Sequence, residues 1–174
     1  MKFWIPLCSI AFICACQAPV DSPNQESTPL TTLILLRHAE QDASQGEDPP
    51  LSEIGQQRAD QLARMLGTAE IDALYATPYR RTMATAQPLA EALGKTIQSY
   101  DPDQDLRETA THFLEKHPGQ TLLVVGHSST VPGLVNALIG ENRYESLAKS
   151  AFGDLFVVTK GDSSQVAVTL VKMP

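Results

Sequence analysis

Two short apolar runs, each followed at once by a histidine, constrain the fold of this chain more than any other feature. Residues 32–36 lead into Arg37 and His38, and residues 122–126 lead into His127. Such runs are typical of strands that are buried on both faces of a parallel sheet. Ligands bind outside the carboxyl ends of these strands. If the two strands are neighbours, the sheet brings two imidazoles and a guanidinium together, a combination suited to chemistry on a phosphate.

From Thr31 onward, strand and helix patterns alternate along the chain. Beside the two apolar runs, further strands are predicted at residues 71–76, 96–100, 155–159 and 166–171, and helices at 51–66, 78–93, 104–116 and 132–139. The turn residues at 161–164 predict that the last two strands form an antiparallel hairpin. We therefore expect a three-layer α/β/α sandwich on a mostly parallel sheet with late antiparallel strands, in which residues 122–125 are central.

The first two predicted helices carry recognisable start and stop signals. Ser52 is a predicted N-cap of the first helix, and Gly67 and Gly94 are predicted to end the first and second helices. Ile54 and Leu62 are among the apolar residues that recur at helical spacing in the first helix. This spacing predicts that both side chains lie on its buried face.

The second predicted helix begins with two arginines at an end that disfavours cations. Thr77 is a predicted N-cap and Pro78 a predicted first residue, so Arg80 and Arg81 lie in the first turn. The helix dipole makes this end partly positive, and helix N-termini are frequent phosphate sites. The placement therefore indicates a bound anion, unless both arginines point into solvent.

The N-terminal residues have the composition of an export signal. Lys2 precedes an apolar stretch over residues 3–15, which is shorter than the ~20 residues of a membrane-spanning helix. Residues 13–16 resemble a bacterial lipobox, in which the final cysteine, here Cys16, is diacylated. The alternatives are a plain signal peptide that is cut near Ala18 and a retained anchor.

From this pattern we expect three parts of the chain. They are a signal peptide with lipobox over residues 1–16, a flexible tether over 17–30 and one domain over 31–174. The domain is then exported and held on a membrane by its lipid, facing the periplasm or the cell exterior.

Composition excludes several classes of function. The formal net charge of -7 argues against non-specific nucleic-acid binding, which needs a basic field. Cys8, Cys14 and Cys16 all lie in the predicted signal segment, so the domain has neither a disulfide framework nor a cysteine nucleophile. Because the chain lacks common metal-ligand spacings, we expect no metal and no cofactor. His112 and His117, on or just after a predicted surface helix, are interpreted as structural.

Four motifs, in this order, resemble those of the histidine phosphatase superfamily, also called the phosphoglycerate mutase-like family. They are Arg37-His38-Ala39, residues 50–59, residues 77–86 and Gly126-His127, within a resemblance that covers residues 32–171. The resemblance implies that His38 takes the phosphoryl group, that Arg37, Arg81 and His127 form the pocket for the anion, and that no metal is required. Arg81, rather than Arg80, has the spacing of the family motif.

The sequence departs from the family pattern at two places. Ala39 replaces a glycine, which requires a negative φ at this residue. The usual glutamate in the loop after the third motif is also missing. Asp101, which follows the strand at 96–100, is our first candidate for the general acid and Glu108 the second, whereas Asp103 is a predicted helix cap. The alternative is that no carboxyl group is catalytic.

We therefore expect a metal-independent phosphomonoester hydrolase of the cell envelope that works through a phosphohistidine on His38. Glu40, next to the site, is expected to orient Arg37 or to contact the substrate. The substrate is expected to be a phosphorylated small molecule or an envelope component. Two alternatives are a non-catalytic, lipid-anchored module that binds phosphate, and a phosphohistidine or phosphoprotein phosphatase.

Overall fold

The computed structural model of the chain describes Met1, residues 29–161 and residues 166–173. Strands and helices alternate through most of this part of the chain. The elements are β1 (Thr31–Arg37), α1 (Glu53–Leu66), β2 (Ala73–Ala76), α2 (Arg80–Leu93), β3 (Ile97–Ser99), α3 (Leu106–Lys116), β4 (Thr121–Gly126), α4 (Thr130–Ile139), β5 (Asp154–Lys160) and β6 (Val166–Lys172).

The strands form one mixed sheet in the order β3-β2-β4-β1-β5-β6. The pairs β2–β3, β2–β4 and β1–β4 are parallel, whereas β5 pairs antiparallel with both β1 and β6. The predicted mostly parallel sheet with late antiparallel strands is thus confirmed. The two apolar runs are the central neighbours β1 and β4, as the sequence predicts.

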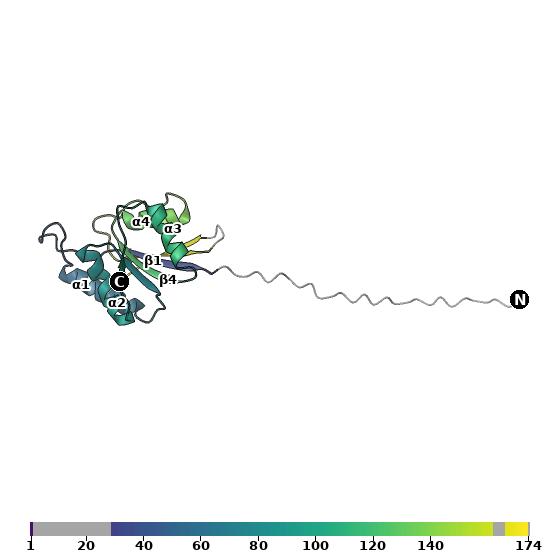
Figure 1. The fold of residues 1–174 in the computed structure, drawn as a ribbon, viewed down its shortest axis with the longest axis horizontal. Coiled ribbons are helices and arrows are strands. Elements are labelled where there is room, and N and C mark those ends of the chain that lie inside the picture. The colour runs from purple at the N-terminus through teal and green to yellow at the C-terminus, as the bar shows by residue number, and fades with distance from the viewer. Residues whose placement is uncertain (2–28, 162–165, 174) are drawn as a thin grey trace.

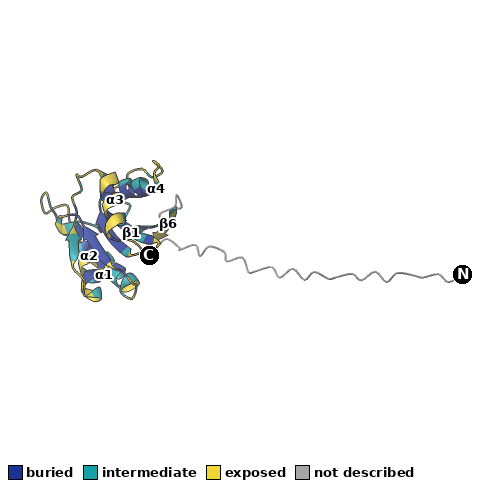
Figure 2. Cartoon of the chain, turned by 45° about the vertical axis from the view of Figure 1, so that its right-hand side comes forward, coloured by how far each residue is buried: buried dark blue, intermediate teal, exposed yellow. Residues whose placement is uncertain are grey.

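Helices cover both faces of the sheet, with α1 and α2 on one side and α3 and α4 on the other (Figure 1). Successive residues of β1 point to opposite faces. Leu33 and Leu35 pack in the cluster that includes α3 and α4, and Ile34 and Leu36 pack in the cluster that includes α1 and α2. Figure 2 shows the buried strands between helices whose outer faces are exposed. Burial on both faces explains why β1 reads as a continuous apolar run rather than an alternating one.

The predicted cap of α1 is confirmed, but one residue of its predicted buried face is wrong. The side chain of Ser52 accepts a hydrogen bond from the backbone N–H of Gly55. The residues buried along α1 are Gly55, Ala59 and Leu62, whereas Ile54 is 62% exposed. Glycine and alanine carry much of this buried stripe because α1 lies close to the chain that follows β1.

The predicted start of α2 is also wrong. The helix begins at Arg80, with Tyr79 at the N-cap position, rather than at Pro78 after a Thr77 cap. The Thr77 hydroxyl is engaged instead with Thr82 and with His127. Tertiary contacts have therefore taken the side chain that local pattern assigns to the cap.

Helix α3 differs from the prediction only at its start. It begins at Leu106 instead of Gln104, and its cap is Asp105, whose carboxylate accepts from the backbone N–H groups of Arg107 and Glu108. The suggested cap Asp103 lies in the preceding loop.

The predictions for the export signal concern residues that the structure does not describe, Cys16 among them. Within residues 29–161 and 166–173, no helix is long and apolar enough to cross a membrane.

Candidate functional site

The site lies at the carboxyl ends of the two central parallel strands. Arg37, the last residue of β1, is in register with Gly126, the last residue of β4, and the backbone N–H of His38 donates to the Gly126 carbonyl at 2.9 Å. The helices that follow these strands, α1 and α4, lie on opposite faces of the sheet (Figure 1). The chain therefore leaves the two strand ends in opposite directions. Such a switch point is where α/β sheets bind ligands, in a crevice outside the carboxyl ends of the strands.

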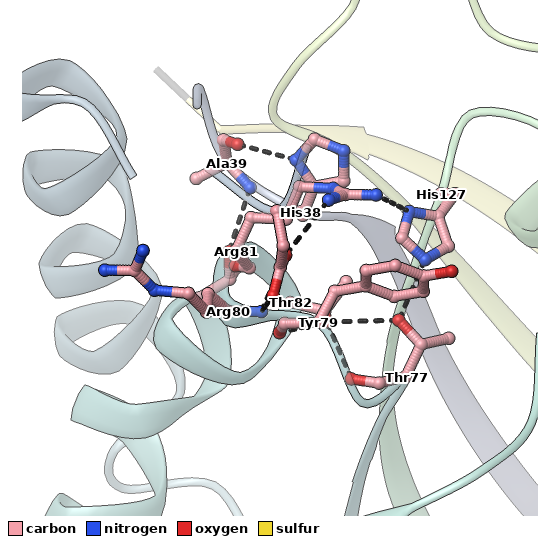
Figure 3. Close-up of polar contacts among 10 residues, drawn as sticks. His38, Ala39, Thr77, Tyr79, Arg80, Arg81, Thr82 and His127 are labelled. Atoms are coloured by element: carbon pink, nitrogen blue, oxygen red, sulfur yellow. Dashed lines mark hydrogen bonds and ion pairs between the residues drawn. The ribbon is translucent and has the colours of Figure 1, made fainter. Parts of the chain in front are cut away.

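The two histidines predicted from the apolar runs face each other in this crevice. The ring centroids of His38 and His127 are 5.5 Å apart, with the rings tilted at 65° (Figure 3). His38 is 4% exposed, and His127 is half-buried. Both imidazoles are thus shielded from bulk water while they remain next to the crevice.

One hydrogen bond determines which nitrogen of His38 is available. Its Nδ1 lies 2.8 Å from the carbonyl oxygen of Ala39, which can only accept, so Nδ1 carries the proton and Nε2 the lone pair. Burial, followed by the nearby charges of Arg37 and Arg81, lowers the pKa of His38 to about 4. At neutral pH the ring is therefore an uncharged imidazole with a free Nε2. Ala39 has a negative φ, as its place in the motif requires.

A chain of hydroxyl groups orients His127. The Thr82 hydroxyl donates to backbone carbonyls and the Thr77 hydroxyl donates to Thr82, so Thr77 accepts from Nε2 of His127 at 2.8 Å. This leaves the lone pair on Nδ1, which lies 3.5 Å from Nη2 of Arg81. Burial and the charge of Arg81 lower the pKa of His127 to about 4, so it too is neutral at pH 7.

Arg37 is held by the loop between α4 and β5. Its Nη1 donates to the backbone carbonyls of Ala148, Lys149 and Ala151 at 3.0–3.2 Å. The ring of Phe152 stacks against the guanidinium at 4.2 Å and also lies 6.3 Å from the His38 ring. The loop thus fixes one end of the guanidinium beside His38.

Arg81 is held in a similar way by a different loop. Its Nη1 lies 3.3 Å from the carboxylate of Asp48, and its guanidinium stacks over the ring of Tyr79 at 4.5 Å. The same carboxylate accepts the backbone N–H of Arg80 at 3.1 Å. The Arg80 side chain points away from the two imidazoles (Figure 3). Asp48 therefore supplies an anion at the start of α2, a role that nothing in the sequence pattern links to position 48.

Each of these arginines keeps one buried donor free. Among the described residues, Nε of Arg37 and Nε of Arg81 are buried side-chain atoms without a hydrogen-bond partner. More than nine-tenths of buried polar groups in proteins are hydrogen-bonded, so each exception needs a cause. Two unsatisfied cationic donors close to a pair of imidazoles are the arrangement expected of a site that binds an anion.

A cavity of about 210 Å³ adjoins this anion site. It is lined by Tyr79, Arg81, Pro102, Asp103, His127, Ser129 and Thr130. Asp103, and not the predicted Asp101, lines the cavity, and its charge acts on His127. Both residues are exposed, and the carboxylate of Asp101 accepts the backbone N–H of Asp103. Glu108, the second candidate, is exposed in the first turn of α3.

The carboxylate of Glu40 is paired with a residue that the sequence analysis did not single out. Arg58 of α1 donates to both of its oxygens, with the contacts at 2.6–3.1 Å. This pairing lowers the pKa of Glu40 and raises the pKa of Arg58. Glu40 thus ties the chain after His38 to α1.

The other two histidines lie away from the crevice. His112 is exposed on α3, whereas His117 is buried and hydrogen-bonded to Tyr75 and Gln120. These positions agree with the structural interpretation of both residues. Among the described residues, no group of three or more His, Cys, Asp or Glu side chains is arranged to hold a metal ion.

Comparisons with known proteins relate part of this chain to a family. The family model described as histidine phosphatase superfamily (branch 1) matches residues 33–115. A curated relative, phosphoserine phosphatase 1 of Hydrogenobacter thermophilus, is 42% identical over 69 residues, which make up 36% of this chain and 33% of the relative. The match therefore spans about a third of that relative's length.

Solved structures show the same fold over most of the chain. A mycobacterial glucosyl-3-phosphoglycerate phosphatase has a TM-score of 0.68 at 16% identity and covers 83% of this chain and all of its own. The protein histidine phosphatase SixA, solved with tungstate, has a TM-score of 0.66 at 17% identity, with coverage of 81% and 96%. At these identities the likeness concerns the fold. The family match ends before His127, so its place in the site rests on the geometry described above.

Proposed function

The chain belongs to the histidine phosphatase superfamily, and from this premise we propose that it hydrolyses phosphomonoesters through a phosphohistidine on His38. The observation that carries the proposal is the pair of buried Nε donors of Arg37 and Arg81, which have no hydrogen-bond partner in the described part of the chain, beside a neutral His38. A phosphoryl group placed there would accept from both donors. It would also present its phosphorus to the free Nε2 of His38.

In the first step the lone pair of His38 Nε2 attacks phosphorus, and the bond from phosphorus to the ester oxygen breaks. The leaving oxygen takes the bonding pair and must be protonated, because an alkoxide is a poor leaving group. In the second step water attacks the phosphohistidine, which releases inorganic phosphate and returns the lone pair to Nε2. Splitting the displacement in two makes each step easier than direct attack by water.

The fixed cations of the site stabilise the charge of the transferring phosphoryl group. Arg37 and Arg81 are each anchored through Nη1, so their Nε donors need no reorganisation when the reaction proceeds. His127 carries a lone pair on Nδ1 and becomes a donor to phosphate once it takes a proton. We propose that these groups suffice without a metal ion.

We assign the proton donor to the loop that precedes α3. Asp101 is the residue predicted from sequence, but Asp103 is the carboxyl group that lines the cavity beside His127. A carboxyl group at this place is within the cavity where the leaving oxygen would lie, and we propose that it gives the proton to that oxygen. Asp101 contributes by holding the backbone of Asp103.

The test is the hydrolysis of p-nitrophenyl phosphate by the full-length chain in the presence of EDTA. We expect turnover to survive EDTA and to fall by at least ~10³-fold in His38→Ala, because the nucleophile is removed. His112→Ala, a replacement at an exposed histidine outside the site, should leave turnover unchanged.

Two results would contradict the proposal in different ways. Loss of turnover in EDTA that is restored by a divalent cation would show that a metal is needed. If the wild-type chain has no turnover but inorganic phosphate raises its unfolding temperature, it is a non-catalytic module that binds phosphate.

The substrate is proposed only as a class. The named relatives are phosphatases of phosphoserine, of glucosyl-3-phosphoglycerate and of protein histidine, so the family name does not select among small and large phosphates. We propose a phosphorylated small molecule or an envelope component as the substrate. Activity confined to a phosphohistidine peptide in a panel with phosphoserine and glycerol phosphate would favour the phosphoprotein alternative.

We also propose that the protein is exported and anchored by a lipid on Cys16. The support is the lipobox-like run at residues 13–16, which lies outside the described residues. Metabolic labelling with a fatty acid should mark the wild-type chain and Cys14→Ser but not Cys16→Ser. Equal labelling of the two variants would overturn the anchor.

A further inference from the structure

Asp48 contacts two parts of the proposed phosphate site at once. Its carboxylate accepts the backbone N–H of Arg80 through both oxygens, at 3.1 and 3.2 Å, and lies 3.3 Å from Nη1 of Arg81. The first contact satisfies a donor at the start of α2, where Tyr79 provides no side-chain cap. The second gives Arg81 a countercharge. Neither role follows from the family motifs, in which position 48 is not included.

The loop that carries Asp48 is tied down at its base. Gln41 and Leu51 form an antiparallel bridge, and the backbone N–H of Asp42 donates to the Pro50 carbonyl at 2.9 Å. Leu51 is buried. Because both ends of residues 42–50 are fixed, the carboxylate has a defined position against α2 even though its side chain is 40% exposed.

The contact to Asp48 leaves the phosphate-facing part of Arg81 free. Asp48 takes Nη1, His127 lies near Nη2, and Nε has no partner among the described residues. A phosphoryl group that used Nε and Nη2 would therefore not compete with the carboxylate. Asp48 thus holds the guanidinium through Nη1 and leaves Nε available for an anion.

We propose that Asp48 is a positioning residue that fixes Arg81 for phosphoryl transfer. This inference rests on the function proposed above. An exposed ion pair contributes little to stability, typically 0–1 kcal/mol, so the value of the contact lies in orientation. Donors fixed in advance matter most in the transition state, where charge on the phosphoryl oxygens develops. Replacement of Asp48 should change substrate binding little. The loss of orientation of Arg81 weakens binding, whereas removal of a negative charge near the phosphate strengthens it.

The test compares Asp48→Asn with Asp48→Ala in the full-length chain. Asparagine keeps an oxygen that can accept from the Arg80 N–H but removes the countercharge from Arg81, whereas alanine removes both. We expect kcat for p-nitrophenyl phosphate to fall ~10–100-fold in both variants, with KM within about threefold of the wild type. Only Asp48→Ala should also lower the unfolding temperature, since only this variant loses the cap.

Two controls isolate the route through Arg81. Asp42→Asn removes a charge from the same loop and should leave kcat unchanged, because the hydrogen bonds of the Asp42 side chain to described residues go to Ser44 and Gln45. In an Arg81→Ala background, Asp48→Asn should have no further effect on kcat, because the group it positions is gone. An unchanged kcat in Asp48→Asn, or an equal loss in both backgrounds, would overturn the proposal.

A measurement without turnover separates this proposal from the proposed function. The Arg81 Nε–H group should give a sharp nitrogen–proton NMR signal in the wild-type chain, assigned by its loss in Arg81→Lys. We expect this signal to broaden or shift in Asp48→Asn and to stay in place in Asp42→Asn. If the wild-type chain has no turnover but the signal responds in this way, the proposed function fails while the positioning role stands. An unresponsive signal overturns the positioning role.

Discussion

Single residues in this site are arranged so that one end of a side chain is held and the other is free. His38 is fixed through Nδ1 and keeps Nε2, and Arg37 and Arg81 are fixed through Nη1 and keep Nε. The partners that hold these groups come from three different segments, namely the backbone of Ala39, the loop at 148–152 and Asp48. Rigidity of this kind lowers the reorganisation needed when charge develops on a substrate.

The residues at the centre of the candidate site could be predicted from the sequence, but the residues that hold them could not. The two apolar runs predict the positions of His38 and His127, because a strand end is a place that local pattern reveals. Asp48 and Phe152 reach the site from loops, and their contacts join positions far apart in the chain. Spacing along the sequence carries no signal for such contacts.

The general acid gives a prediction at the scale of one residue. Asp103→Asn should slow hydrolysis of an alkyl phosphate far more than that of p-nitrophenyl phosphate, because p-nitrophenolate leaves without protonation. We expect a loss of ~10²–10⁴-fold on the alkyl substrate, the usual contribution of a positioned acid, and a loss below about tenfold on the activated one. Steady-state kcat on both substrates is the measurement.

Asp101→Asn is the matched control for this prediction, since it removes a carboxylate from the same loop outside the cavity. It should lower both rates by similar, smaller factors. A selective loss in Asp101→Asn instead of Asp103→Asn would restore the assignment made from sequence.

At the scale of elements, the helices were predicted well in their interiors and less well at their starts. The cap of α1 and the glycine after α2 act locally, so sequence pattern reveals them. The start of α2 depends on Thr77, whose hydroxyl serves the site, and on Asp48, which caps from a distance. A helix that begins at a functional site is therefore where local rules fail.

The contact between α1 and the chain after His38 gives a prediction for an element. A Cβ at Gly55 would overlap the backbone carbonyl of Glu40, which cannot rotate away. Gly55→Ala should therefore destabilise the fold by about 3 kcal/mol, as overpacking against rigid atoms does, and should lower turnover by moving the chain next to His38. Urea unfolding followed by circular dichroism measures the first effect.

Gly133→Ala in α4 is the matched control. Its Cβ would meet the end of the Leu106 side chain, which can rotate, and alanine in a helix gains about 1 kcal/mol over glycine. Its net effect should stay within about 1 kcal/mol of zero. Equal losses in the two variants would show that α1 does not depend on this close approach.

For the molecule as a whole, the fold can be predicted from the order of the helix and strand patterns, and the candidate site lies where two of the strands end. Alternating helices and apolar strands predict three layers, and the order of elements then leaves few ways to pair the strands. The sheet order places β1 beside β4, which are far apart in the sequence, and this pairing creates the site. The family motifs point independently to His38 and His127. The sequence therefore predicts both the sheet and the two histidines at its edge.

The stability of the whole molecule should depend on pH through its two neutral histidines. Burial lowers the pKa of His38 and of His127 to about 4, whereas an unfolded histidine titrates near 6.5. Between these values the unfolded chain binds more protons than the folded one, so stability is fully present above pH 6.5 and is lost as the pH falls toward 4. From pH 7.5 to 5.0 we expect a loss of about 2 kcal/mol from His38, and a smaller loss from the more exposed His127.

Glu40 does not interfere with this test. Its hydrogen bonds to Arg58 lower its pKa, so its contribution to the free energy of unfolding is lost only at pH values below the ordinary carboxyl range. The measurement is the free energy of unfolding in urea at pH 7.5 and pH 5.0, for the wild-type chain and for His38→Gln. Glutamine does not titrate, so the loss between the two pH values should shrink by about 2 kcal/mol in this variant. An identical loss in both chains would mean that folding leaves the pKa of His38 unchanged, so that burial does not hold the ring neutral. A larger loss in His38→Gln would mean that folding raises the pKa of His38, and a protonated ring has no free lone pair for phosphoryl transfer.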